Sequence, residues 1–314
     1  MTSESDFIAG LRAIATDPAA RGLLDDAAVL EIGGTNLVVT HDMIVEGVHF
    51  LPSDPPGDVA WKLVAVNLSD LAAKGARPVG ALLGFSLAGE GEWDRAFTEG
   101  LRQALTGFGI ALLGGDTVSL PKDAPRVLGV TAIGTAERAP SRAGARLGDQ
   151  LWLSGSIGDA GAGLRILKGE DGPAALVERY RQPRPRVELG IALAPLVSAM
   201  MDVSDGLLID ASRIADASDL ALEIVLGAVP FSGAFMEMLG EGRDARLFAA
   251  TAGDDYELLF AADKGRAAEL LALAEDIGIP LSRIGSFERG GGIRLFDGEQ
   301  EVPLPERLGY EHLS

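Results

Sequence analysis

The sequence predicts a protein of two domains, one α/β and one α+β, and two observations lead to this class. Strand-like apolar runs alternate with helix-like stretches in both halves of the chain, which is typical of mixed layered folds. The length of 314 residues favours two domains. A polar segment rich in Arg and Gly at 137–149 is the best place for a boundary, so we divide the chain into residues 1–138 and 139–314.

The first half begins with a short amphipathic helix at 7–15, and the turn Gly33-Gly34 then joins two strands. We expect the next helix, at 58–75, to be capped by Asp58 and ended by Gly75. The strands of this half are expected at 28–32, 36–45, 81–87, 110–113 and 126–134, with a further helix at 92–107.

The second half opens with a strand at 150–154, which a Gly-rich turn and a helical run follow. Two prolines interrupt the helical run within the Arg-rich stretch 181–186. This stretch either orients the two domains or forms a solvated loop. Further helices are expected at 187–200, 206–217 and 266–277, and further strands at 220–226, 256–262, 282–285 and 293–296.

The composition is that of an ordinary globular protein, with 47% hydrophobic and 23% charged residues. The chain has no cysteine, which excludes a disulfide framework, a thiolate metal site and a cysteine nucleophile. Its N-terminus has no basic region followed by an apolar stretch, and no apolar run approaches the ~18 residues of a membrane span. We therefore expect a cytoplasmic protein with no membrane partner.

Acidic residues exceed basic ones by 46 to 27, which gives a formal net charge of −19. Such a surface repels nucleic acid and anionic lipid, so we expect no nucleic-acid partner. If the substrates are phosphates, divalent cations must screen the carboxylates near them. For most of these acids, the charge is expected only to keep the protein soluble.

Several of the acids stand where chemistry is expected, at the ends of apolar strands or beside glycine. For one such Asp alone, helix capping or turn formation is the more frequent explanation. Their recurrence favours a magnesium site, because magnesium prefers oxygen ligands. Asn67 and Asp70 lie three residues apart and so share a helix face. The acids that follow or precede strands and glycines are Asp25, Asp26, Asp42, Asp116, Asp202, Asp205, Asp254 and Asp255.

Two Gly-rich segments allow a phosphate-binding interpretation. At 114–117, Gly-Gly-Asp-Thr would let backbone N–H groups approach a phosphate closely. At 154–161, a strand, a Gly-rich turn and a helix start follow one another. The second segment lacks both the Gly-Lys-Ser/Thr ending and the Gly-x-Gly-x-x-Gly pattern, so a tight turn between packed elements is favoured there.

Motifs spread over nearly the whole chain together resemble the thiamine-monophosphate kinase family of the aminoimidazole-ribonucleotide synthetase-like superfamily. The resemblance implies an N-terminal α/β domain whose strands form an intersubunit barrel in a homodimer. It also implies a C-terminal α+β domain that closes a cleft holding ATP and substrate. The motifs occur in the family's order at 25–30, 42–50, 65–73, 114–117, 141–145, 184–186, 202–206 and 253–258.

Carried over position by position, the resemblance implies specific site residues. The implied magnesium ligands are Asp26, Thr40, Asp42, Asp70, Asp116, Asp202 and Asp205. The implied ATP contacts are Gly115, Asp116, Arg142 and Ser204, and the implied substrate contacts are His49, Asp254 and Tyr310. The chain departs from the family's pattern at Leu24, where Gly is usual, at Thr40-His41-Asp42-Met43, where Ser/Thr-x-Asp-Thr is usual, and at Asp254, where Glu is usual.

The implied activity is phosphorylation of thiamine monophosphate to thiamine diphosphate by ATP with several Mg²⁺ ions. A phosphate monoester has a second pKa near 6, so at neutral pH it is already a competent nucleophile. Catalysis then depends on positioning and charge neutralisation, for which Asp42, Asp116 and Asp205 are the expected catalytic residues. Because the carboxylates are not accompanied by an activated nucleophile, direct in-line transfer is expected.

Three other functions remain open. They are the activity of an aminoimidazole-ribonucleotide synthetase-like enzyme, a non-catalytic sensor of magnesium and nucleotide, and a metal-dependent phosphohydrolase. The superfamily's selenophosphate and hydrogenase-maturation enzymes depend on cysteine or selenocysteine, so the lack of cysteine argues against both.

Overall fold

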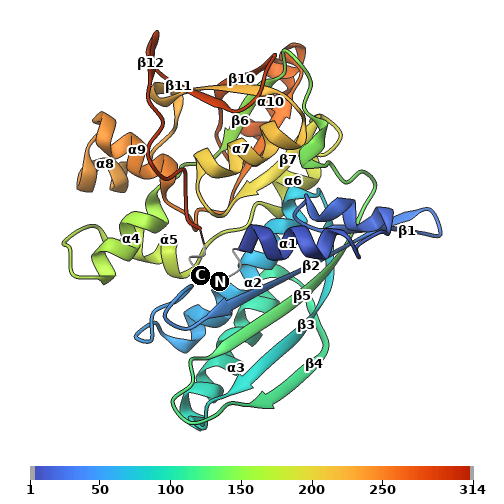
Figure 1. Cartoon of the computed structure of the whole chain (residues 1–314). Coiled ribbons are helices and arrows are strands. Elements are labelled where there is room, and N and C mark those ends of the chain that lie inside the picture. The colour runs from blue at the N-terminus through green and yellow to red at the C-terminus, as the bar shows by residue number, and fades with distance from the viewer. Residues whose placement is uncertain (1–3, 312–314) are drawn as a thin grey trace.

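Each half of the chain forms one mixed β-sheet in the computed structural model, which describes residues 4–311. The first sheet has the strand order β1-β2-β5-β3-β4, and the second has the order β12-β11-β8-β10-β6-β9-β7. Figure 1 shows the first sheet below and the second above, with helix α2 reaching from one to the other. The two sheets and their helices agree with the predicted α/β plus α+β class.

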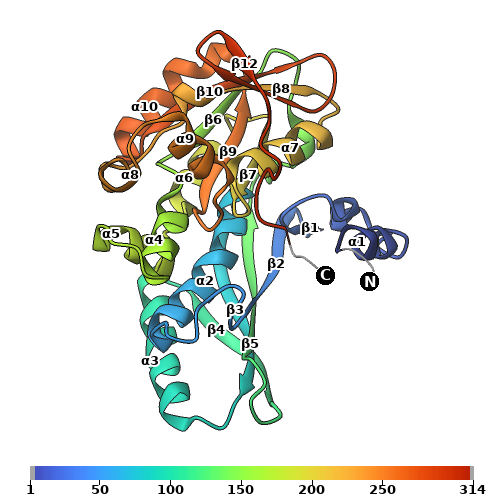
Figure 2. The ribbon, with the colours of Figure 1, turned by 60° about the vertical axis from the view of Figure 1, so that its left-hand side comes forward.

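In the first half, helices cover one face of the sheet. Strands β3 and β4 pair in parallel, and the other neighbours are antiparallel. Helices α2 and α3 pack on one face around a core that includes Phe97 and Leu128 (Figure 2). The elements are α1 (Glu4–Arg12), η1 (Pro18–Leu23), β1 (Ala28–Ile32), β2 (Thr35–Val45), α2 (Pro56–Ala73), β3 (Arg77–Leu87), α3 (Gly91–Phe108), β4 (Ala111–Ser119) and β5 (Val127–Ala136).

In the second half, seven helices accompany the sheet within the described residues. The strands are β6 (Gln150–Ser154), β7 (Ala199–Val203), β8 (Ala221–Val225), β9 (Glu257–Ala262), β10 (Leu281–Glu288), β11 (Ile293–Asp297) and β12 (Gln300–Val302). The helices are α4 (Asp159–Leu167), α5 (Ala174–Arg181), α6 (Val187–Leu193), α7 (Leu207–Ala217), α8 (Gly233–Leu239), α9 (Arg243–Thr251) and α10 (Ala267–Ile277), with short 3₁₀ turns η2 (Arg142–Gly144), η3 (Leu226–Ala228) and η4 (Lys264–Arg266). Between residues 4 and 311, no helix has the length and apolar character that crossing a membrane requires.

Helix α2 is the element that joins the halves. It packs against α3, β2 and β5 on one side and against α6 and β7 on the other. Because both sides are covered, its polar residues are buried as well as its apolar ones. The buried polar side chains of α2 and of the C-cap residue that follows it are Lys62, Asn67, Ser69, Asp70 and Lys74.

Three sequence predictions need correction. Asp58 does not cap α2: the N-cap is Pro55, and Asp58 accepts a hydrogen bond from Gln182 at 2.6 Å. The helix expected at 187–200 ends at Leu193, because Pro195 lacks the N–H that a continuing helix needs, and Ala199–Val203 pairs with β9 instead. The strand expected at 110–113 continues to Ser119 along β3.

The Arg-rich stretch 181–186 bridges the two halves, which favours the domain-orienting interpretation. Arg181 Nε lies 2.9 Å from Asp54 Oδ1 in the first half, and Arg186 Nε lies 2.7 Å from the buried Glu257 in the second. Between them, the Pro183 carbonyl accepts a hydrogen bond from Trp61 of α2 at 2.9 Å.

The contact between α2 and α6 depends on Gly190. A Cβ atom at this position would lie 2.0 Å from the Ala72 carbonyl oxygen. We expect Gly190→Ala to destabilise the protein by about 1–3 kcal/mol, because the helices must separate. Thermal unfolding measures the loss. Gly233→Ala is the matched control, since a Cβ there meets no atom within 4 Å; equal unfolding temperatures for the two variants would contradict the prediction.

Candidate active site

Three carboxylates from both halves meet at the junction. Asp26 precedes β1, Asp70 lies on α2 and Asp202 lies on β7. One oxygen from each lies within 4.8 Å of the other two. Asp70 and Asp202 are buried, and Asp26 is nearly covered, with 1% of its side chain exposed. We call these three residues the carboxylate cluster.

Hydroxyl groups and burial shape the chemistry of the carboxylate cluster. Thr40 donates a hydrogen bond to Asp70, and Ser69 donates one to Asp202 at 2.6 Å. Burial raises the pKa of Asp70 and of Asp202 well above the ordinary value, and neighbouring carboxylates raise both further. A divalent cation would offset this repulsion, and the all-oxygen donor set fits magnesium rather than a softer metal.

Two positively charged side chains, Lys74 and Arg142, contact the carboxylate cluster. The buried Lys74 contacts both Asp25 and Asp26, with 2.7 Å from its Nζ to Asp26 Oδ2, an atom that otherwise has no hydrogen bond. Arg142 Nε donates to Asp26 Oδ1 at 2.9 Å. Although burial acts to raise it, Lys74 and Arg21 lower the pKa of Asp25 to about 2. Arg142, predicted as an ATP contact, here ties the turn η2 to the carboxylate cluster.

Sequence reasoning missed Lys74, although a lysine followed by glycine at the end of an apolar helix was a visible signal. It also missed Asp210, which is fully buried on α7. Asp210 accepts hydrogen bonds from the N–H groups of Ser204 and Asp205, at 3.0 and 3.1 Å. It therefore holds the turn that presents these two residues. Asp205 itself is half-buried and pairs with Arg213 at 2.6 Å.

Asp42 connects the carboxylate cluster with a cavity. It lies inside β2, as the strand predicted at 36–45 requires, rather than directly after an apolar strand, and its N–H donates to Asn67 Oδ1 at 2.9 Å. Burial raises the pKa of Asp42 to about 6, with a lowering effect from His41 and raising effects from Asp26 and Asp205. Of the predicted metal ligands, Asp42 and Asp205 both line this cavity. The substituted His41 side chain bonds Thr131 at 2.9 Å.

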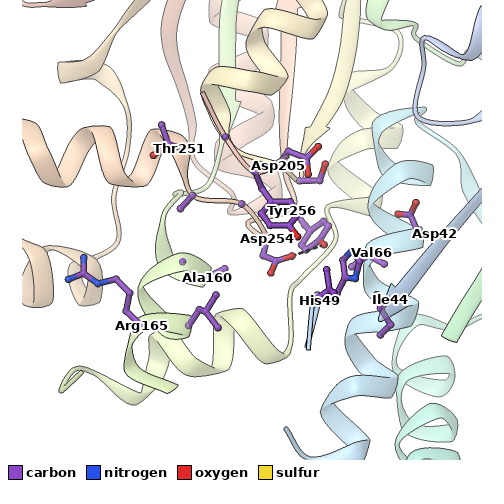
Figure 3. Close-up of a pocket in the computed structure, with 18 of the residues that line it drawn as sticks. Asp42, Ile44, His49, Val66, Ala160, Arg165, Asp205, Thr251, Asp254 and Tyr256 are labelled. Atoms are coloured by element: carbon purple, nitrogen blue, oxygen red, sulfur yellow. Dashed lines mark hydrogen bonds between the residues drawn. The ribbon is translucent and has the colours of Figure 1, made fainter. Parts of the chain in front are cut away.

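The cavity, about 560 Å³, lies between the halves and contains six of the predicted site residues. Figure 3 shows His49, Asp254 and Tyr256 gathered on one wall, with Asp42 and Asp205 nearby. Leu164 and Arg165 of α4 and Phe248 of α9 are among the other residues that line the cavity. The predicted residues that line it are Asp42, His49, Ser204, Asp205, Asp254 and Tyr310.

The Gly-rich turn at 154–161 is a packing turn, as the sequence favoured. The N–H groups of Gly158 and Ala160 at the start of α4 donate to Asp255, at 2.7 and 3.4 Å. These donors are therefore satisfied by a carboxylate of the protein itself. At Gly158, a Cβ atom would lie 2.6 Å from the Ala249 side chain, so close packing explains this glycine.

Asp116 and Gly115 lie apart from the carboxylate cluster. Both belong to β4, an edge strand whose nine residues are all exposed. Across the sheet, Asp42 pairs with Val130, Val130 with Leu83, and Leu83 with Gly115. The backbones of Asp42 and Gly115 are therefore three strand spacings apart, or about 14 Å. Since side chains alternate along a strand, Asp116 faces the opposite side of the sheet from Asp42. A single chain does not bring Asp116 to the carboxylate cluster.

Comparison with known proteins identifies the class that this fold and site define. Residues 24–136 match the family described as AIR synthase related protein, N-terminal domain, and residues 146–298 match its C-terminal domain. A thiamine-monophosphate kinase of Caulobacter vibrioides is 41% identical over 322 residues, which cover 99% of this chain and 91% of that protein.

Solved structures agree with this class. The thiamine-monophosphate kinase of Stenotrophomonas maltophilia has a TM-score of 0.78 and 40% identity, covering 92% of this chain and 94% of that one. A structure described as AaThiL complexed with AMPPCP and TMP has a TM-score of 0.85 and 29% identity, covering 99% and 97%. The chain belongs to the thiamine-monophosphate kinase family of the AIR synthase related proteins.

Proposed function

We propose that this protein transfers the γ-phosphate of ATP to thiamine monophosphate, which gives thiamine diphosphate and ADP, with magnesium as the cofactor. The observation that carries the proposal is the carboxylate cluster beside a cavity that holds the predicted substrate residues. The relative bound to AMPPCP, an ATP analogue, and TMP supports the same pair of substrates.

The reaction needs charge neutralisation more than it needs a base. An oxygen of the acceptor phosphate forms a bond to the γ-phosphorus while the bond to the ADP oxygen breaks, in line and without a phospho-enzyme. Magnesium ions, when bound, would offset the charge of both polyanions. Asp42 and Asp205 are proposed to orient the reacting groups at the cavity. The residues proposed to hold the ions are Asp26, Thr40, Asp42, Asp70, Asp116, Asp202 and Asp205.

Substrate contacts are proposed on both sides of the cavity. His49, Asp254 and Tyr310 line it and are proposed to contact thiamine monophosphate, with the Tyr310 ring proposed to stack on a flat heterocycle. Ser204 lines it and is proposed to contact ATP together with Gly115, Asp116 and Arg142. The cytoplasmic location and the division at residues 138 and 139 stay predictions.

We also propose that the active form is a homodimer joined through the first sheet. The exposed face and edge of this sheet carry many apolar side chains, and large exposed apolar patches mark interaction sites. The metal-type residue Asp116 stands on this surface, away from its own carboxylate cluster. A second copy packed there would cover the apolar side chains and supply Asp116 to the neighbouring site. The exposed apolar residues of these strands are Leu30, Ile32, Met43, Val79, Leu82, Leu87, Leu112, Leu113 and Val118.

Incubation with ATP, magnesium and thiamine monophosphate tests the proposed activity. We expect ADP and thiamine diphosphate in equal amounts, loss of both with EDTA, and inversion at a chiral, isotopically labelled γ-phosphate. Retention of configuration would contradict direct transfer. ADP without thiamine diphosphate would indicate a phosphohydrolase or another acceptor of the superfamily. ATP binding without either product would indicate a sensor.

A further inference from the structure

Lys62 of α2 is a buried lysine that does not line the cavity itself but contacts residues that do. Only 2% of the residue is exposed. Its Nζ donates to Asp254 Oδ2 and to the His49 carbonyl oxygen, each at 2.9 Å, and lies 4.0 Å from the centre of the Tyr180 ring. Lys62 thus contacts two predicted substrate residues, one from each half of the chain.

Asp254 is held in one conformation from several directions. Its backbone has a φ of 71°, which is uncommon for a residue other than glycine. Its N–H donates to the Ser204 carbonyl at 2.8 Å, and the Tyr256 hydroxyl donates to Oδ1 at 3.0 Å. Lys62 takes the other oxygen, so both carboxylate oxygens are fixed.

Both side chains that donate to Asp254 are buried. Burial, followed by the Asp254 carboxylate, raises the pKa of Tyr256 well above its ordinary value, so its hydroxyl stays a donor. A buried ammonium group is costly unless it is paired and hydrogen-bonded, and Lys62 obtains both from Asp254 and His49. The orientation of Asp254 and the position of the 46–50 turn therefore depend on the same ammonium group.

We infer that Lys62 is a positioning residue for the phosphate acceptor: it holds Asp254 and the His49 backbone at the spacing that the acceptor's thiamine moiety requires. The inference rests on the proposed function, because it presupposes that Asp254 contacts thiamine monophosphate. The inference extends the proposed substrate site to a residue that does not line the cavity. The ion pair between Lys62 and Asp254 also joins the two halves of the chain beside the proposed acceptor site. The Nζ partners His49, Asp254 and Tyr180 include no predicted ATP contact, so we expect ATP binding not to depend on this bond.

Steady-state kinetics of Lys62→Met in the full-length protein test the inference. We expect the KM for thiamine monophosphate to rise about tenfold or more, a loss of about 1.4 kcal/mol, while the KM for ATP stays within about twofold. Lys264→Met, which removes an exposed lysine from η4, is the control and leaves both values unchanged. Equal increases in both KM values would show a general structural effect and overturn the inference.

A double-mutant cycle with Asp254→Ala shows whether Lys62 acts through Asp254. If it does, the double variant has the same KM for thiamine monophosphate as Asp254→Ala, because the second change removes an interaction already lost. If the KM increase of the double variant equals the product of the two single-variant increases, the two residues act independently, and the inference is overturned. An unchanged KM in Asp254→Ala would instead refute the proposed substrate site. A raised KM in Asp254→Ala with a normal KM in Lys62→Met would refute the role of Lys62 alone.

Tyr256→Phe keeps the inference testable if Lys62→Met does not fold. It removes one hydroxyl group and so frees Asp254 Oδ1 while leaving the ring in the core. We expect an increased KM for thiamine monophosphate, an unchanged KM for ATP and an unfolding temperature close to that of the original protein. An unchanged KM for thiamine monophosphate would show that fixing Asp254 does not matter for the acceptor.

Discussion

Asp202→Asn is expected to lower kcat by about 10³-fold or more, since a bound divalent cation contributes several kcal/mol to transition-state stabilisation and each 1.36 kcal/mol is tenfold in rate. Asp202 contributes one of the three oxygens of the carboxylate cluster. An asparagine keeps the size of the side chain and its bond with Ser69 but removes the charge. The protein should therefore fold and fail to hold the ion.

Thermal unfolding with and without magnesium separates this effect from misfolding. Binding to the folded state alone raises its stability, so magnesium should raise the unfolding temperature of the original protein and EDTA should reverse the gain. In Asp202→Asn, the gain should be largely lost. The metal-free variant should be at least as stable as the metal-free original protein, because one of three mutually repelling buried charges is gone.

Asp276→Asn is the matched control for Asp202→Asn, because it removes an exposed carboxylate on α10. We expect this variant to keep both its activity and its response to magnesium. A normal magnesium response in Asp202→Asn, or a metal-free protein that is much less stable, would show that the carboxylate cluster is a structural network rather than a metal site.

A heterodimer of two inactive chains is expected to regain about half of the activity of the original dimer. One chain carries Asp42→Asn and the other carries Asp116→Asn, and each alone should be inactive. If every site combines Asp42 of one chain with Asp116 of the other, both substitutions fall in one site of the heterodimer and the second site is intact. Co-expression with two different tags allows purification of the heterodimer for assay.

The alternative arrangement gives a different result. If Asp116 serves its own chain, each site of the heterodimer carries one substitution and the heterodimer stays inactive. Failure to recover any doubly tagged species would contradict the dimer itself. A control heterodimer of one original chain and one Asp116→Asn chain should also show about half of the activity, since one of its two sites is complete.

Local sequence patterns predicted most of the elements because local rules determine them. The strands at 28–32 and 150–154 have the predicted bounds, since turn residues and apolar runs mark both ends. The prediction failed where a local pattern was ambiguous. An apolar run after Pro195 fits helix or strand, and pairing with β9 decided for the strand. Helices α8 and α9 and strand β12 were not predicted at all.

The sequence by itself determined the family and the residue types of the site, because ordered motifs and the positions of aspartates beside apolar runs and glycines are properties of the chain. The tertiary structure decided which of these residues meet. Burial of α2 on both sides brought Asp70 to Asp26 and Asp202 and gave Lys62 and Lys74 their partners. Strand register placed Asp116 on an exposed edge, three strands from Asp42. Register and burial depend on contacts between distant parts of the chain, so no local pattern contains them.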